Sequence, residues 1–137
     1  MNALEDGTAV CLDFGKVQSA AKTLEQLLPV VLQHADTHTV LFVGYANEAA
    51  LRETLQTRRA VLWSSSRDEL WRKGATSGDW LDLVDVQVNC EQNSLLYIVR
   101  PRTGGVCHTT DIGGQARDSC YYRRLSPDGG ALMFRGA

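Results

Sequence analysis

Three cysteines and a histidine lie within residues 89–120 of the sequence. They are Cys90, Cys107 and Cys120, with His108 directly after the second cysteine. Thiolate and imidazole are ligands that zinc prefers in proteins. The spacing is too wide for a zinc-finger knuckle, whose paired cysteines lie about two to four residues apart. Separate strands and loops must therefore bring these residues together. The alternative is three core cysteines that never meet, but the polar Cys107–His108 pair after a glycine-rich turn favours a metal site.

Three cysteine ligands would leave zinc with one open coordination position, which is the pattern of catalytic zinc sites. A zinc-bound water loses its proton near neutral pH and becomes a nucleophile. On an extended backbone His108 points to the opposite side from Cys107, so we expect it to act as a general acid or base rather than as a ligand. Cys11 is far from the other cysteines in sequence, and we expect it to be a small buried hydrophobic residue.

A second candidate site is the glycine-bounded loop at residues 74–79, which follows Arg72 and Lys73. Its hydroxyls, backbone N–H groups and two flanking cations suit a phosphate group. Polar loops bounded by glycines are also common without any ligand, so composition alone leaves both interpretations open.

The hydrophobic pattern predicts an α+β fold with a mainly β-sheet core and a few flanking helices. Helical spacing favours helices at residues 17–27 and 48–57, the second with Asn47 as its N-cap. In the second helix Ala50, Leu51, Thr54 and Leu55 form the expected buried stripe. Strands are expected at residues 29–33, 39–45, 60–65, 81–90, 95–99, 120–123 and 131–134, with a short apolar-to-basic segment at 70–73. Strict alternation in the strand at residues 81–90 would put Val84, Val86, Val88 and Cys90 on one face.

The size and composition fit one domain over residues 1–137. Hydrophobic residues make up 44% of the chain, and the net charge is −2, which argues against nucleic-acid binding by bulk charge. The N-terminus lacks the features of a signal peptide, and no apolar run is long enough to cross a bilayer. We therefore expect a cytoplasmic protein without a membrane partner, whose cysteines are thiols or metal ligands.

Taken together, these motifs resemble the phosphoribosyl-AMP cyclohydrolase family. The resemblance covers about residues 27–123 and is carried by Trp63-Ser64-Ser65-Ser66-Arg67, Leu70-Trp71-Arg72-Lys73-Gly74, Thr76-Ser77-Gly78, Cys90, Cys107-His108-Thr109 and Ser119-Cys120-Tyr121-Tyr122-Arg123. It implies zinc-dependent hydrolysis of the N1–C6 bond of the adenine ring of phosphoribosyl-AMP, a step of histidine biosynthesis.

The resemblance also implies roles for individual residues. Cys90 of one subunit would bind zinc together with Cys107 and Cys120 of the other in an intertwined homodimer, and His108 would assist catalysis. The nucleotide substrate would be held by Ser64, Ser66, Arg67, Trp71, Arg72, Lys73, Gly74, Thr76, Ser77 and Gly78.

The sequence departs from the family pattern at several positions. The family carries Asp-Cys-Asp-x-Asp around its first zinc cysteine, and these aspartates bind magnesium; here the positions are Asn89, Glu91 and Asn93. Magnesium favours anionic oxygen ligands, so this site is expected to be weak or lost. The segment 111–117 lengthens the gap between the last two cysteines. These departures keep two alternatives open: a divergent paralogue acting on another purine-like nucleotide, and a catalytically silent zinc-binding homodimer.

Overall fold

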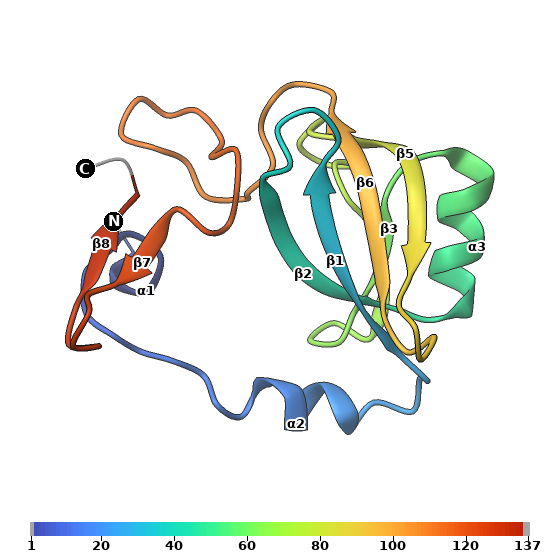
Figure 1. Ribbon diagram of the computed structural model, residues 1–137, viewed down its shortest axis with the longest axis horizontal. Helices are drawn as coiled ribbons and strands as arrows, with labels where there is room; N and C mark the ends of the chain where they lie inside the picture. Colours follow the sequence, from blue (N-terminus) through green and yellow to red (C-terminus); the bar gives the residue numbers. More distant parts are fainter. Residues whose placement is uncertain (1, 136–137) are drawn as a thin grey trace.

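A curled six-stranded β-sheet forms the body of the molecule (Figure 1). The computed structural model describes residues 2–135. The strand order is β4-β3-β2-β1-β6-β5, and all neighbours are antiparallel except β1 and β6. The strands are β1 (Leu28–His34), β2 (Val40–Ala46), β3 (Val61–Ser64), β4 (Glu69–Arg72), β5 (Leu81–Val88) and β6 (Leu95–Pro101).

The sheet closes on itself through the segment that leads into β3. Arg59 pairs with Asp82 at the start of the edge strand β5. On either side of this bridge, the Ala60 N–H donates to the Leu81 carbonyl at 2.9 Å, and the Leu83 N–H donates to the Arg58 carbonyl at 2.8 Å. An edge strand that finds backbone partners leaves fewer unpaired groups exposed, so the closure gives the sheet a rigid, barrel-like interior.

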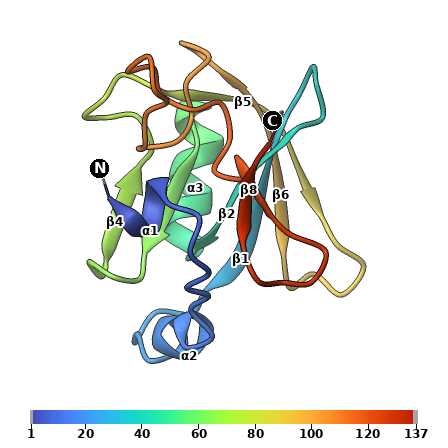
Figure 2. The ribbon, with the colours of Figure 1, turned by 90° about the vertical axis from the view of Figure 1, so that its left-hand side faces the viewer.

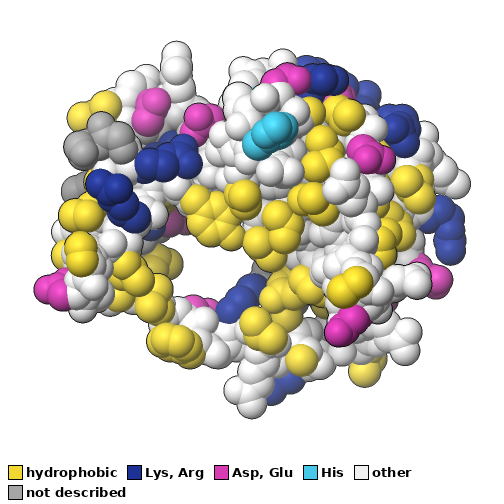
Figure 3. Space-filling view, viewed as in Figure 1, with side chains coloured by type: hydrophobic (Ala, Val, Ile, Leu, Met, Phe, Trp, Pro, Cys, Tyr) yellow, Lys and Arg dark blue, Asp and Glu magenta, His cyan; other side chains and the backbone are white. Residues whose placement is uncertain are grey.

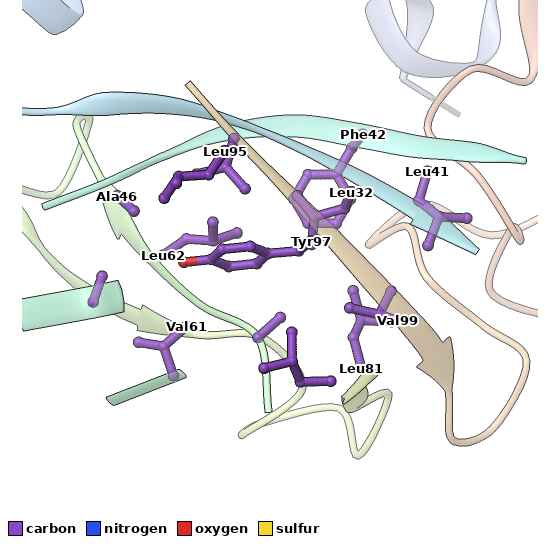
Figure 4. Close-up of a cluster of buried hydrophobic side chains, with 14 of the residues drawn as sticks. Leu32, Leu41, Phe42, Ala46, Val61, Leu62, Leu81, Leu95, Tyr97 and Val99 are labelled. Carbon is purple, nitrogen blue, oxygen red and sulfur yellow. The ribbon is translucent and has the colours of Figure 1, made fainter. Parts of the chain in front are cut away.

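Apolar side chains fill this interior (Figure 4). Leu32, Leu62 and Tyr97 come from three different strands and are fully buried. Helix α3 (Glu48–Thr57) covers one side of the sheet (Figure 1). It begins at Asn47, whose side chain accepts the Ala50 N–H at 2.8 Å, as expected of an N-cap.

The two ends of the chain form a second body beside the sheet, which faces the viewer in Figure 2. We call residues 2–8 and 121–135 the terminal lobe. It contains α1 (Ala3–Asp6) and the antiparallel pair β7 (Arg123–Leu125) and β8 (Leu132–Phe134). The Leu132 N–H donates to the Thr8 carbonyl at 2.9 Å, which ties the N-terminus to β8. Helix α2 (Lys16–Ala21) lies in the connection from the lobe to β1.

The prediction of a mainly β core with a few short helices is confirmed, and differences appear at element ends. The expected helix at 17–27 ends at Ala21, because it finds little to pack against: Leu24 is fully exposed. The strand expected at 120–123 begins only at Arg123, because the Cys120 N–H donates to the Leu41 carbonyl and the Tyr121 N–H donates to the Ser119 hydroxyl. In α3, Leu55 is 47% exposed and does not join the buried stripe.

The alternation expected along β5 is wrong, because the strand contains a bulge. Leu83 pairs with Val99 and Asp85 pairs with Ile98, so Val84 is an extra residue without a cross-strand partner. An inserted residue reverses which later side chains face inward. Val86 therefore packs against the core, whereas Val84 is exposed. No helix among residues 2–135 is long and apolar enough to cross a membrane.

Candidate metal centre and active-site cleft

Cys107 and Cys120 lie together on the segment that follows β6. The N–H groups of Val106 and Cys107 both donate to the Arg117 carbonyl at 2.9 Å, which folds the segment back on itself. The Cys120 N–H donates to the Leu41 carbonyl at 2.8 Å, which fastens the second cysteine to β2. As a result, the thiols of Cys107 and Cys120 are close enough to influence each other's protonation.

The contact polarises this pair of thiols. The contact with Cys120, with weaker help from Thr109 and His108, lowers the pKa of Cys107 to about 5, although burial acts in the opposite direction. The same contact raises the pKa of Cys120. At neutral pH the two groups therefore favour holding one proton between them, as a thiolate beside a thiol. A thiolate is the form of cysteine that binds metal.

Lys73 is a buried cation beside the two cysteines. Its side chain is 6% exposed, and its ammonium donates to the Asp79 carbonyl at 3.0 Å. Burial lowers the pKa of Lys73, while Asp79 and the two cysteines favour its charged form. Lys73 therefore lies near the thiols, with its ammonium on a backbone carbonyl of its own chain, and the contact with substrate that the resemblance implies stays a prediction.

Cys90 lies away from this pair. It is exposed on the turn between β5 and β6, at the start of β6. Cys107 comes after the opposite end of the same strand (Figure 1). Seven residues of β-strand span about 20 Å. In residues 2–135, no three His, Cys, Asp or Glu side chains come close enough together to hold a metal ion. One chain therefore supplies two neighbouring thiols and one distant thiol.

The remaining cysteine, Cys11, is exposed, so the expectation that it is buried is wrong. Together with Cys120 it lines a pocket of about 200 Å³. Residues 8–13 form an irregular segment beside the β7–β8 pair. This segment does not pack into a hydrophobic core. Figure 3 shows a hollow between the terminal lobe and the sheet, bordered by hydrophobic side chains.

His108 points into a large cleft of about 1460 Å³ between residues 103–118 and the terminal lobe. Its side chain is 78% exposed, and its Nε2 lies 2.9 Å from Glu5 Oε1. An ionised carboxylate only accepts hydrogen bonds. In the neutral form of the His108 ring, Nε2 would therefore carry the hydrogen and Nδ1 the lone pair.

The cleft also contains residues that no sequence motif indicated. Arg117 lies 3.3 Å from the Asp6 carboxylate and stacks over the ring of Tyr122, 3.9 Å from its centroid. The Tyr122 hydroxyl donates to the Glu5 carbonyl. The contacts of Asp6 with Arg117 and of Glu5 with Tyr122 join residues more than 100 positions apart, and no local pattern signals such pairs. Arg117 ends the lengthened segment 111–117, which was the one available hint.

The residues expected to bind substrate fall into two groups at opposite ends of β4. Ser64, Ser66 and Arg67 form the turn before β4, and the loop 74–78 follows it. The turn is held by the Arg67 N–H, which donates to the Ser64 hydroxyl at 3.2 Å. Within one chain, the structure does not bring these two groups together.

Within β4, the two side chains assigned to substrate already have partners. Trp71 packs on Phe42 with ring centroids 5.7 Å apart. Arg72 makes a two-pronged ion pair with Glu53 of α3, at 2.5 and 2.8 Å. In the following loop Gly74 has a φ of +95°, and a Cβ there would lie 2.5 Å from the Trp80 nitrogen. The loop therefore requires glycine, while Thr76 and Ser77 remain exposed.

Comparison with known proteins identifies the family. The family model for phosphoribosyl-AMP cyclohydrolase matches residues 42–122. The chain belongs to the phosphoribosyl-AMP cyclohydrolase family. The phosphoribosyl-AMP cyclohydrolase of Hyphomonas neptunium is 43% identical over 110 residues, which cover 80% of this chain and 77% of the relative. That of Archaeoglobus fulgidus is 43% identical over 102 residues, covering 74% and 88%. A histidine biosynthesis bifunctional protein of Pasteurella multocida is 39% identical over 100 residues, covering 73% of this chain and 46% of its own length.

These matches confirm the prediction of a cyclohydrolase-family enzyme. The part matched by the phosphoribosyl-AMP cyclohydrolase family model contains Cys90, Cys107, His108 and Cys120. Glu5 and the β7–β8 pair lie outside it. The cleft thus combines family residues on one wall with residues of this chain's own ends on the other.

Proposed function

We propose that this protein is a zinc-dependent phosphoribosyl-AMP cyclohydrolase of histidine biosynthesis. It would hydrolyse the N1–C6 bond of the adenine ring and work in the cytoplasm as a homodimer. The observation that carries the proposal is the Cys107–Cys120 contact in a chain of this family. The assignment of residues 1–137 to one domain is part of the same proposal.

The donor set fits zinc. Cys107 and Cys120 offer two soft sulfur ligands, one of them already poised as a thiolate. A third would come from the partner subunit's Cys90, because this residue is exposed on a turn and distant from the other two within its own chain. When bound, zinc would supply a Lewis acid that makes water nucleophilic near neutral pH.

The outer face of the sheet supports a second copy as the partner. Val43 pairs with Val31, and Val31 pairs with Leu96, so three strands place an apolar row side by side. Val43 is 48% exposed, and Val88 near the Cys90 turn is 55% exposed. Contiguous exposed apolar side chains commonly mark association surfaces. Burial of this row would carry the Cys90 turn of each chain toward the other.

His108 has the position of a proton carrier. Ring opening takes up one water: its oxygen ends on C6, one proton ends on N1, and the other ends on the exocyclic nitrogen of C6, which becomes a carboxamide. With Nε2 engaged by Glu5, the lone pair on Nδ1 of His108 can take a proton within the cleft. Thr76 and Ser77 on the loop, and Ser64, Ser66 and Arg67 on the turn, would hold the phosphates and ribose. Arg72 and Lys73 would act indirectly, through Glu53 and the thiols.

The test is ring opening of phosphoribosyl-AMP, followed by ultraviolet absorbance on zinc-loaded protein. We expect Cys107→Ser to lose zinc and activity, and His108→Ala to keep zinc while kcat falls by about 10²–10⁴-fold. His38→Asn is the matched control, because His38 is an exposed turn histidine at positive φ, where Asn is tolerated.

Other results would redirect the proposal. A zinc-loaded dimer that leaves phosphoribosyl-AMP unchanged but opens another purine nucleotide would support a divergent paralogue. A zinc-loaded dimer without turnover of any purine nucleotide would support a silent zinc-binding protein. An unchanged rate in His108→Ala would remove its catalytic role.

A further inference from the structure

The turn between β5 and β6 is closed by its own side chains. Asn89 Oδ1 accepts two backbone hydrogen bonds, from the N–H groups of Asn93 and Ser94, each at 2.9 Å. Asn89 Nδ2 donates to Asn93 Oδ1 at 2.6 Å, and Asn93 Nδ2 donates to Glu91 Oε2 at 3.2 Å. The three side chains that surround Cys90 in sequence therefore form one connected network.

These residues do not fit magnesium. The ion requires an octahedral set of oxygen ligands and favours carboxylates. Here the amide oxygens of Asn89 and Asn93 already accept hydrogen bonds within the turn. The groups directed toward the neighbouring oxygens are N–H donors, which repel a cation. Glu91 is the one carboxylic side chain of the three, and its Oε2 already accepts a hydrogen bond from Asn93.

We infer that this turn binds no magnesium and that its amide hydrogen bonds perform the structural task that a cation performs for three carboxylates. Three carboxylates in one short turn repel one another and need a counter-charge. Two neutral amides and one carboxylate donate and accept among themselves instead. Magnesium is expected here only because of the proposed function, so the inference rests on that proposal.

The consequence concerns Cys90, which lies inside this turn. The backbone is fixed on both sides of it, by the Asn89 side chain and by the Gln92 N–H, which donates to the Asn89 carbonyl at 3.0 Å. Gln92 has a φ of 54°, so the turn also contains a residue in the left-handed region of backbone conformation. The network can therefore present the Cys90 thiol to a partner subunit without a divalent ion.

Magnesium binding to the intact protein tests this inference by isothermal titration calorimetry, alongside thermal unfolding with and without the ion. The wild type should give no binding heat and no shift in midpoint. The double variant Asn89→Asp/Asn93→Asp restores three acidic side chains, so it should bind Mg²⁺ about tenfold or more tightly than the wild type. The matched control Gln18→Glu/Gln56→Glu adds the same charge at exposed sites elsewhere and should resemble the wild type.

The alternatives are distinct. Wild-type binding that disappears in Glu91→Gln would overturn the inference, whereas wild-type binding that survives this change would place the ion elsewhere and leave the turn metal-free. If neither the wild type nor the double variant binds, the claim that the amides exclude the ion is wrong. Magnesium binding is measured without any enzymatic reaction. The outcome of this test is therefore independent of whether the cyclohydrolase assay succeeds or fails.

Discussion

The curled sheet and the terminal lobe are held together in different ways. The sheet is joined by continuous backbone ladders and a closure at Arg59 and Asp82, and it encloses side chains such as Leu32 and Tyr97 that are fully buried. In the lobe the β7–β8 pair has three residues in each strand, and side-chain contacts around Arg117 connect it to the cleft. Cooperative backbone and core contacts resist local opening better than a few surface contacts do. We therefore expect the sheet to be a stable scaffold and the terminal lobe, which forms one wall of the cleft, to open more easily.

The largest expected effect is at the centre of the sheet. Leu32→Ala removes a fully buried side chain and should lower the free energy of unfolding by about 2–5 kcal/mol. The matched change in the lobe is Leu125→Ala, where the side chain is 45% exposed and the expected loss is about 0.5 kcal/mol or less. Urea unfolding followed by far-ultraviolet circular dichroism measures both. Equal losses would show that sheet and lobe form one equally packed unit.

A smaller effect is expected where α3 meets β3. The buried Thr54 hydroxyl donates to the Ala50 carbonyl at 2.8 Å and accepts the Val61 N–H at 3.0 Å. Thr54→Val keeps the shape but leaves the Val61 N–H buried without a partner, at a cost of about 1–3 kcal/mol. Thr57→Val on the same helix is the control, because its hydroxyl donates to the Glu53 carbonyl at an exposed position. If the two variants unfold at the same urea concentration, this buried hydrogen bond does not stabilise the sheet.

Sequence patterns predicted the sheet better than the cleft, for a physical reason. Strands and α3 follow from local periodicity and from the Asn47 cap, both of which are readable over a few residues. The bulge at Val84 was missed although the sequence carries a sign of it: the apolar positions change from odd (Leu81, Leu83) to even (Val84, Val86, Val88) at this point. The cysteines were identified by type and spacing, yet no pattern indicated that Lys73 turns toward them or that Glu5 reaches His108. Such contacts arise only when segments distant in sequence fold together.

The lobe itself can be loosened at Arg117. Arg117→Met removes the Asp6 ion pair and the cation–π contact with Tyr122 but keeps an apolar stem. A cation–π contact is worth roughly 1 kcal/mol, so the amide of Leu132, which donates to Thr8, should exchange about fivefold faster. The amides of β6 should be unchanged and serve as the internal reference. Arg124→Met, an exposed position on β7, is the control variant. Faster exchange throughout the sheet as well would contradict the separation of the two regions.

Acid should have a similar but weaker effect through Asp6. The Asn2 N–H, followed by Arg117, lowers the pKa of Asp6 below its ordinary value. A carboxylate with a lowered folded-state pKa stabilises the fold above its unfolded pKa, and the contribution is lost as pH falls through the folded value. Exchange at Leu132, corrected for the intrinsic rate, should therefore rise relative to β6 as pH falls below about 4. Asp6→Asn should show the faster exchange already at pH 7 and a flatter pH profile in this range. An Asp6→Asn profile that still follows the wild type would mean that another group, such as Glu5 against His108, fastens the N-terminus to the cleft.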